Sequence, residues 1–131
     1  MSHWSLKYMR AGYKLGADGP EDYDCWNFVR WIWRDHYGID MPALPTPGDM
    51  TEQLRLFATN VSELGWKQVA EPKNGDGVLF VRAKAGIHVG IYIGDLSPPR
   101  VLHNDDGGPK LHMFSHLESL RWSWRFYRYG V

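Results

Sequence analysis

The sequence contains a single cysteine, Cys25, so no disulfide bond can form within the chain. Its 15 lysines and arginines are matched by 15 aspartates and glutamates, so there is no charge excess to attract nucleic acid or an anionic membrane. No apolar run is long enough to span a membrane, and residues 1–10 lack the apolar stretch of a signal peptide. We therefore expect a protein that binds no nucleic acid, has no membrane span and carries no signal peptide.

The 131 residues suffice for one domain, and no repeat or low-complexity tract divides them. Apolar residues with helical spacing come first, and they predict helices over 4–15, 25–38 and 50–59. Period-two alternation follows, and it predicts strands at 77–82, 87–94, 100–104, 110–114 and 122–129. This order predicts an α+β domain over residues 1–131, in which N-terminal helices pack on an antiparallel sheet of about five strands.

Cys25 stands where a helical pattern begins after a turn-rich stretch. Asp24 or Asp22 can cap this helix, and Gly38 can end it. Backbone N–H groups in the first turn of a helix have no internal partners and carry partial positive charge, so they favour a thiolate and can bind an oxyanion. A lone cysteine is more often a small buried side chain than a nucleophile, so its role depends on its neighbours.

A histidine able to activate this thiol, His88, begins the strand-like run 88–94. Side chains alternate along a strand, so His88 and Gly90 lie on one face, and the glycine leaves room beside the imidazole. A hairpin symmetric about Asp95 and Leu96 would place His103 directly opposite His88, where it could orient the ring. A cysteine followed by a histidine on a later strand is the order of a papain-like cysteine hydrolase.

The other histidines fall in no catalytic spacing, and we expect them at the surface or in packing: His3, His36, His112 and His116. Cys25, His88 and His103 are also residue types that bind zinc. No Cys-x-x-Cys pair is present, however, and none of these three residues belongs to a His-x-x-x-His pair. The sequence therefore predicts no metal and no other cofactor.

Several motifs together resemble the NlpC/P60 family of cell-wall cysteine peptidases: Tyr13-x-x-Gly16, Asp24-Cys25, Gly75-Asp76-Gly77-Val78-Leu79-Phe80, the run from His88 to Gly94, and His103 on the next strand. The resemblance implies the papain-like NlpC/P60 fold, with the nucleophile helix packed on the sheet. It also implies that Cys25 is the nucleophile and His88 the general base. His103 would orient His88, and Tyr13 would help to hold the substrate or the oxyanion.

The family cleaves peptidoglycan stem peptides, typically between D-iso-glutamate and the following diamino acid, and some relatives are amidases. Most members have Ser-Gly after the cysteine, whereas this chain has Trp26-Asn27. Asp-Cys-Trp together with Gly19-Pro20 resembles the branch encoded in phage and prophage tail clusters. The resemblance implies phage tail-tip proteins as partners, synthesis in the bacterial cytoplasm, and use in a virion tail or tail-like particle.

Other functions remain open at this point. A catalytically silent tail assembly or structural protein would keep the same fold, and a secreted effector amidase would use the same site. The related lipid acyltransferases place their histidines before the cysteine, which is the reverse of the order here. The stretch between His88 and His103 is longer than is typical of the family, so Asn104 and Asp105 are alternative third catalytic residues.

Overall fold

The computed structural model describes residues 3–42, 59, 61–82 and 86–130. Its helical segments are the 3-10 helix η1 (Trp4–Arg10), α1 (Cys25–Ile32), the π-helical turn η2 (Trp33–Tyr37) and α3 (Phe114–Ser119). The strands are β1 (Gly12–Tyr13), β2 (Asp22–Tyr23), β3 (Trp66–Val69), β4 (Gly77–Arg82), β5 (Gly86–Ile93), β6 (Arg100–Asp105), β7 (Gly108–Met113) and β8 (Ser123–Tyr129). Apart from Thr59, the helix predicted over 50–59 lies outside the described residues.

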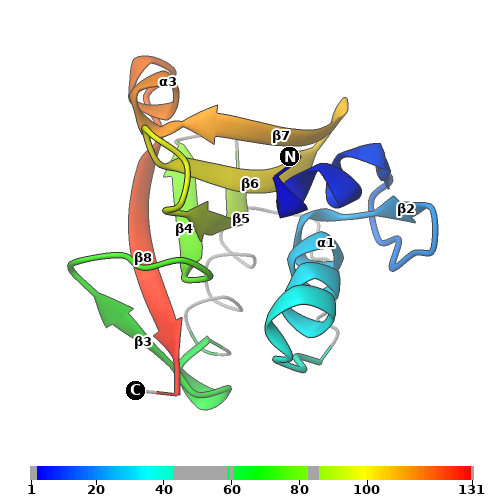
Figure 1. Cartoon of the computed structure of the whole chain (residues 1–131), viewed down its shortest axis with the longest axis horizontal. Helices are drawn as coiled ribbons and strands as arrows, with labels where there is room; N and C mark the ends of the chain where they lie inside the picture. The colour runs from blue at the N-terminus through cyan, green and yellow to red at the C-terminus, as the bar shows by residue number, and fades with distance from the viewer. Residues whose placement is uncertain (1–2, 43–58, 60, 83–85, 131) are drawn as a thin grey trace.

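Six of the strands form one antiparallel sheet in the order β3-β8-β4-β5-β6-β7 (Figure 1). The predicted α+β class is therefore confirmed, with β3 as a strand that the sequence analysis did not identify. β3 has only four residues, and its Lys67 and Gln68 are exposed, so it lacks an apolar alternation. Among the described residues, no helix has the length and apolar character needed to cross a membrane.

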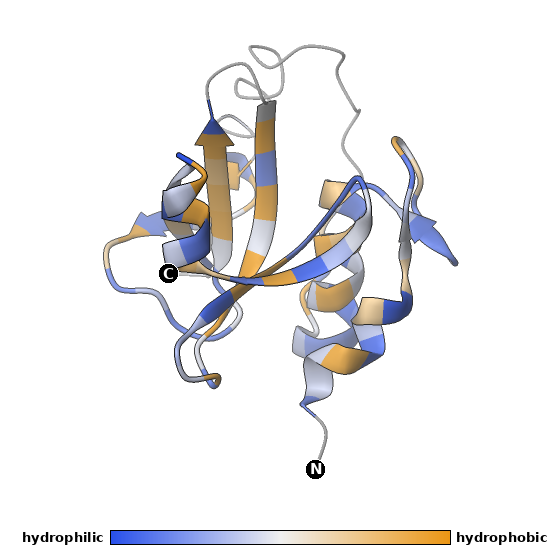
Figure 2. Cartoon of the chain, turned by 90° about the horizontal axis from the view of Figure 1, so that it is seen from above, coloured by the Kyte–Doolittle hydropathy of each residue, from blue (hydrophilic) through white to orange (hydrophobic). Residues whose placement is uncertain are grey.

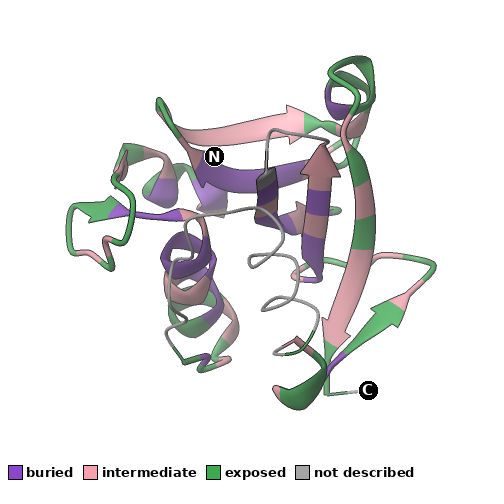
Figure 3. Cartoon of the chain, turned by 180° about the vertical axis from the view of Figure 1, so that it is seen from behind, coloured by how far each residue is buried: buried purple, intermediate pink, exposed green. Residues whose placement is uncertain are grey.

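The two faces of the sheet are buried by different helices. The alternate residues Ile87, Val89 and Ile91 of β5 join Val29 and Ile32 of α1 in the larger core cluster. On the opposite face, Leu117 of α3 packs in a smaller cluster of buried residues that includes Val78, Phe80 and Val101. Figure 2 shows the alternation of apolar and polar residues along the strands, and Figure 3 shows that buried residues concentrate in α1, β4, β5 and β6.

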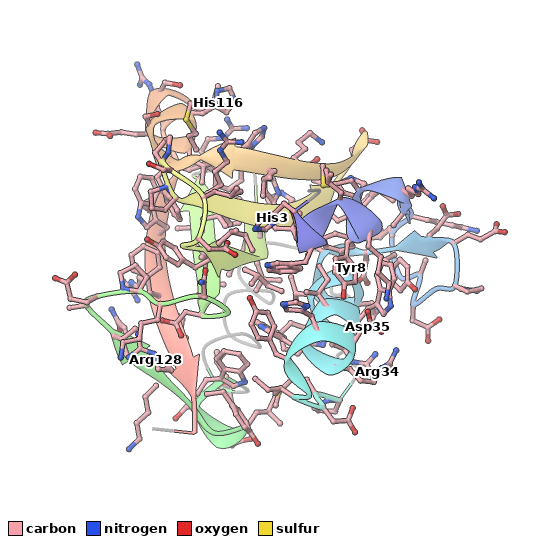
Figure 4. The ribbon with its side chains drawn as sticks, viewed as in Figure 1. His3, Tyr8, Arg34, Asp35, His116 and Arg128 are labelled. Atoms are coloured by element: carbon pink, nitrogen blue, oxygen red, sulfur yellow. The ribbon has the colours of Figure 1, made fainter. Side chains whose placement is uncertain are left out.

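The predicted helix over 4–15 is wrong beyond Arg10. The Gly12 N–H donates to the carbonyl of Glu21 at 2.9 Å, and Tyr13 then pairs with Tyr23, so the chain leaves the helix to form the parallel pair β1–β2. The Tyr8 hydroxyl donates to Asp35 at 2.6 Å and ties η1 to the segment after α1 (Figure 4). These contacts hold β1 close to the start of α1.

The register between β5 and β6 differs by two residues from the prediction. Gly90, rather than His88, pairs with His103, and the ladder runs on to Ile93 and Arg100. Pro98 and Pro99 have no N–H to donate to a ladder, so the strand resumes only at Arg100. The Asn74 side chain accepts hydrogen bonds from the backbone of Gly94 and Asp95, which fixes the connecting loop. His88 and His103 remain on one face but lie diagonally across the strand pair.

Candidate active site

Cys25 is the first residue of α1 and is half-buried. Asp24 is the N-cap, and its carboxylate accepts a hydrogen bond from the Asn27 N–H at 2.8 Å. Farther along the helix, on the face that carries Cys25, Phe28, Val29 and Ile32 are fully buried in the core, as their spacing predicts. The nucleophile predicted from the sequence is thus held at the beginning of a helix that the core anchors.

Two groups of interactions shift the pKa of the Cys25 thiol in opposite directions. Burial, with a smaller contribution from the Asp24 carboxylate, raises the pKa of Cys25 to about 12. Backbone N–H groups of Val89, Trp26 and Cys25 itself act in the other direction and lower this pKa. The Val89 amide places the sulfur beside β5, the strand that carries His88. The His88 side chain itself points to the opposite face of that strand, so the structure does not bring the imidazole into contact with the thiol.

The two residues that follow Cys25 stabilise the helix rather than line an open site. Trp26 is buried, and its Nε1–H donates to the carbonyl of Pro42 at 2.9 Å. The Asn27 amide donates to the Ala17 carbonyl at 3.2 Å, and its oxygen accepts from Arg30 at 2.7 Å. Asn27 therefore links α1 to the loop that precedes the cysteine, a contact that glycine could not make.

Tyr13 lies on β1, close enough to Cys25 for their charges to interact. The pKa of Tyr13 is raised above its ordinary value, first by burial and then by the charges of Cys25 and Asp24. Its ring is half-buried, so part of the side chain remains accessible beside the thiol. The structure thus brings together Tyr13 and Cys25, the two N-terminal residues selected from the sequence.

His88 lies on the face of β5 that is opposite the α1 core, among aromatic side chains. Its ring lies 5.5 Å from that of Phe80 and 5.3 Å from that of Trp122, measured between centroids. Arg82 lies over the same Trp122 ring at 4.7 Å. Burial lowers the pKa of His88 and keeps the imidazole neutral. No hydrogen bond within the described residues joins this ring to Cys25 or to His103, and the buried Nδ1 atom of His88 has no partner.

His103 is the ring neighbour of His88, with centroids 6.3 Å apart. It is almost fully buried, at 2% exposure, and burial is the main cause that lowers its pKa to about 3. Asp105 also acts on this pair, because its carboxylate raises the pKa of His88 against the effect of burial, and it lies 4.0 Å from the Nδ1 atom of His103. Both residues therefore lie where a third catalytic residue could act.

Asn104, the remaining alternative, points to the other face of the sheet. Its Nδ2 group donates to the carbonyls of Gly12 and Tyr23, at 3.1 and 2.9 Å. These two carbonyls flank Tyr13 and Cys25 along the chain, and the side chain of Asn104 is fully buried. Asn104 thus fastens β6 to β1 and β2, and it has no contact with His88.

This fastening predicts a large effect of Asn104→Asp on stability. The aspartate side chain has the same shape as asparagine, but it places an oxygen where the Nδ2 donor was. The carbonyls of Gly12 and Tyr23 then lose their hydrogen bonds and face a negative charge, so we expect the free energy of unfolding to fall by about 2–4 kcal/mol. Urea unfolding measures this loss. Asn74→Asp is the matched control, since the Asn74 oxygen only accepts hydrogen bonds. Equal losses in the two variants would contradict the role given to Asn104.

The burial of His103 predicts a pH-dependent stability. An unfolded histidine titrates near pH 6.5, whereas burial lowers the pKa of folded His103 to about 3. Below pH 6.5 the unfolded chain binds a proton that the folded protein does not, so stability falls as the pH decreases, by up to about 1.4 kcal/mol per pH unit. Urea unfolding between pH 7 and pH 5 should show a smaller loss for His103→Gln than for the wild type. Parallel pH curves would contradict a neutral buried His103.

One residue near this site was missed by the sequence analysis. His112, expected at the surface or in packing, places its Nδ1 atom 3.2 Å from Nε2 of His103. A signal for this contact was present in the sequence, because Asp106-Gly107 is a strong two-residue hairpin turn. That turn pairs Val101 with His112 and His103 with Lys110, which puts both histidines on one face.

The fold and the site define a helix-borne thiol beside a histidine-bearing antiparallel sheet. The chain belongs to the NlpC/P60 family, whose model matches residues 10–128. It is similar in fold to the NlpC/p60 domain of peptidoglycan hydrolase SagA, with a TM-score of 0.56 and 21% sequence identity. That match covers 93% of this chain and 91% of the SagA chain.

Two curated relatives share part of the sequence. Murein DD-endopeptidase MepS/Murein LD-carboxypeptidase of Escherichia coli is 31% identical over 83 residues, which are 63% of this chain and 38% of that protein. Probable endopeptidase p60 of Listeria innocua is 29% identical over 104 residues, which are 79% of this chain and 19% of that protein. The matched part is therefore well under half of each relative.

Proposed function

We propose that this chain is a cysteine peptidase that hydrolyses peptidoglycan stem peptides, cutting between D-iso-glutamate and the following diamino acid. The observation that carries the proposal is the position of the Cys25 sulfur at the first turn of α1, against the backbone amide of Val89 on β5. Family membership and the murein endopeptidase among the relatives support the same substrate class.

The proposed reaction requires the His88 imidazole, which lies on the opposite face of β5 in this structure, to reach Cys25. His88 then takes the thiol proton as the sulfur of Cys25 attacks the carbonyl carbon of the scissile bond. Backbone N–H groups at the start of α1 and the Tyr13 hydroxyl stabilise the oxyanion of the tetrahedral intermediate. His88 then protonates the leaving amine, and a water molecule hydrolyses the thioester to release the acid and regenerate the thiol.

The two pKa shifts decide the resting state of this pair. Burial raises the pKa of Cys25 to about 12 and lowers the pKa of His88, so the neutral thiol and neutral imidazole are favoured over the ion pair. We therefore expect the proton to move as the substrate is attacked, rather than before it binds.

The direct test is digestion of defined muropeptides by the purified wild-type protein, with the products identified by mass spectrometry. Hydrolysis of the D-iso-glutamyl bond releases a fragment that begins with the diamino acid. Release of the whole stem peptide from the sugar would instead identify an amidase. Intact substrate after prolonged incubation of folded protein would favour a catalytically silent tail protein.

We propose further that the protein acts as part of a phage tail or a tail-like particle. The support is the resemblance of Asp24-Cys25-Trp26 and the preceding Gly19-Pro20 to the tail-encoded branch of the family. Mass spectrometry of purified particles from the producing strain tests this proposal. Recovery of the chain with tail-tip proteins supports it, and recovery only in the particle-free fraction contradicts it.

A further inference from the structure

Four histidine rings follow one another from β5 to α3, on the sheet face that carries His88. The centroid distances are 6.3 Å between His88 and His103, 5.1 Å between His103 and His112, and 4.5 Å between His112 and His116. Only the middle pair makes a polar contact, between Nε2 of His103 and Nδ1 of His112 at 3.2 Å. The described residues contain no group of three or more His, Cys, Asp or Glu side chains that could hold a metal ion.

This contact couples the protonation of the two rings. Two neutral imidazoles that meet nitrogen to nitrogen need one ring to donate and the other to accept. His103 is almost fully buried, at 2% exposure, so solvent cannot replace a missing partner at its Nε2 atom. The tautomer of His103 is therefore coupled to that of His112 as long as the contact is kept.

The other nitrogen of His103 is the one left for the active site. The Nδ1 atoms of His88 and His103 are both buried and both lack hydrogen-bond partners. The nearest carboxylate oxygen to Nδ1 of His103 belongs to Asp105, at 4.0 Å, and this carboxylate already binds Lys110. Whether His103 offers a proton or a lone pair at Nδ1 depends on whether its Nε2 atom donates to His112 or accepts from it.

We infer that His112 is a positioning residue, which holds His103 in a single tautomer and orientation so that His103 can in turn orient His88. This inference rests on the proposed function, because orientation of His88 matters only if His88 acts as the base. His116 has no part in it: its ring packs against that of His112 at a tilt of 48°, and its side chain is exposed at the start of α3, away from α1 (Figure 4).

Three variants separate this role from simple ring packing. His112→Phe keeps an aromatic ring but removes the nitrogen that meets His103. His112→Asn keeps a polar atom near the place of Nδ1 and can either accept or donate there. His116→Ala removes the neighbouring ring and leaves the contact between His103 and His112 intact, so it is the matched control.

The first measurement is the nitrogen-15 NMR spectrum of the histidine rings, in which protonated and unprotonated ring nitrogens have different shifts. The His103 signals are assigned by their loss in His103→Gln. We expect one tautomer of His103 in the wild type, in His112→Asn and in His116→Ala, and a mixture in His112→Phe. A mixture in the wild type, or a single unchanged tautomer in His112→Phe, would overturn the inference.

The second measurement is muropeptide hydrolysis by the same proteins. We expect kcat to fall about tenfold in His112→Phe with KM unchanged, and to stay near the wild-type value in the other two variants. An equal loss in His112→Asn and His112→Phe would show a packing role and overturn the inference. If the wild type hydrolyses no muropeptide, the proposed function fails, whereas the NMR spectra still decide whether His112 holds His103.

Discussion

Cys25→Ala is expected to abolish muropeptide hydrolysis and to leave the fold intact. The reaction needs a sulfur nucleophile, and removal of a nucleophile commonly costs a factor of about 10⁴ or more in kcat. Cys25 is the only cysteine, so no second thiol can replace it. Its side chain is small and only half-buried at the start of α1, so the loss of stability should stay near about 1 kcal/mol. Product masses and urea unfolding measure the two effects separately.

Cys25→Ser and a chelator complete this experiment. The serine hydroxyl keeps the polarity of the site but lacks a nucleophile of comparable strength, so it should be as inactive as the alanine variant. Wild-type hydrolysis in the presence of a chelator should continue unchanged, and its loss would instead point to a zinc enzyme. Undiminished cleavage by Cys25→Ala would reject the cysteine peptidase proposed here.

The protonation state of the Cys25 thiol in the free protein can be tested without a substrate. Because burial raises the pKa of Cys25 to about 12, alkylation by iodoacetamide should be slow at pH 7 and should accelerate as the pH rises. Slow alkylation together with rapid hydrolysis would indicate that the substrate assists the proton transfer. Fast alkylation at pH 7 would instead indicate a thiolate paired with an imidazolium before the substrate binds.

The sequence predicts the nucleophile helix well because its signals are local. Asp24 caps the helix, apolar residues recur at helical spacing, and Gly38 ends the helical segment in the left-handed conformation, with a φ of 71°. Local patterns also predict most of the sheet. They fail at β3, because its four residues form a strand only by pairing with β8. The residues of β3 show no alternation that would predict this pairing.

The details of the site depend on contacts between distant segments, and these were harder to predict. The position of His103 relative to His88 depends on the loop between β5 and β6. The side chain of Asn74, 20 residues before Gly94 in the sequence, accepts a hydrogen bond from this loop. The choice among His103, Asn104 and Asp105 follows from the face on which each side chain lies, which the two-residue change of register does not alter. The contact of His112, by contrast, could have been predicted from the Asp106-Gly107 turn and its register.

Replacement of the histidines should reveal their division of labour. His88→Ala is expected to lower kcat by about 10³-fold or more, because His88 is the general base of the proposed reaction. His103→Ala should cost less, since the His88 imidazole can still reach the productive tautomer by itself. His103→Asn and His103→Gln should retain more activity than His103→Ala, because an amide can donate or accept a hydrogen bond in place of the ring.

Asp105→Asn decides whether His103 or Asp105 is the third catalytic residue. The Asp105 carboxylate raises the pKa of His88, but it is also bound by Lys110, so part of its charge is already neutralised. We therefore expect a smaller loss of kcat than in His103→Ala, together with a lower apparent pKa in the acidic limb of the kcat/KM profile. If Asp105→Asn costs more than His103→Ala, the carboxylate orients the base and His103 serves the packing of the sheet. Orientation of the His88 ring by the His103 ring would then have no part in the reaction.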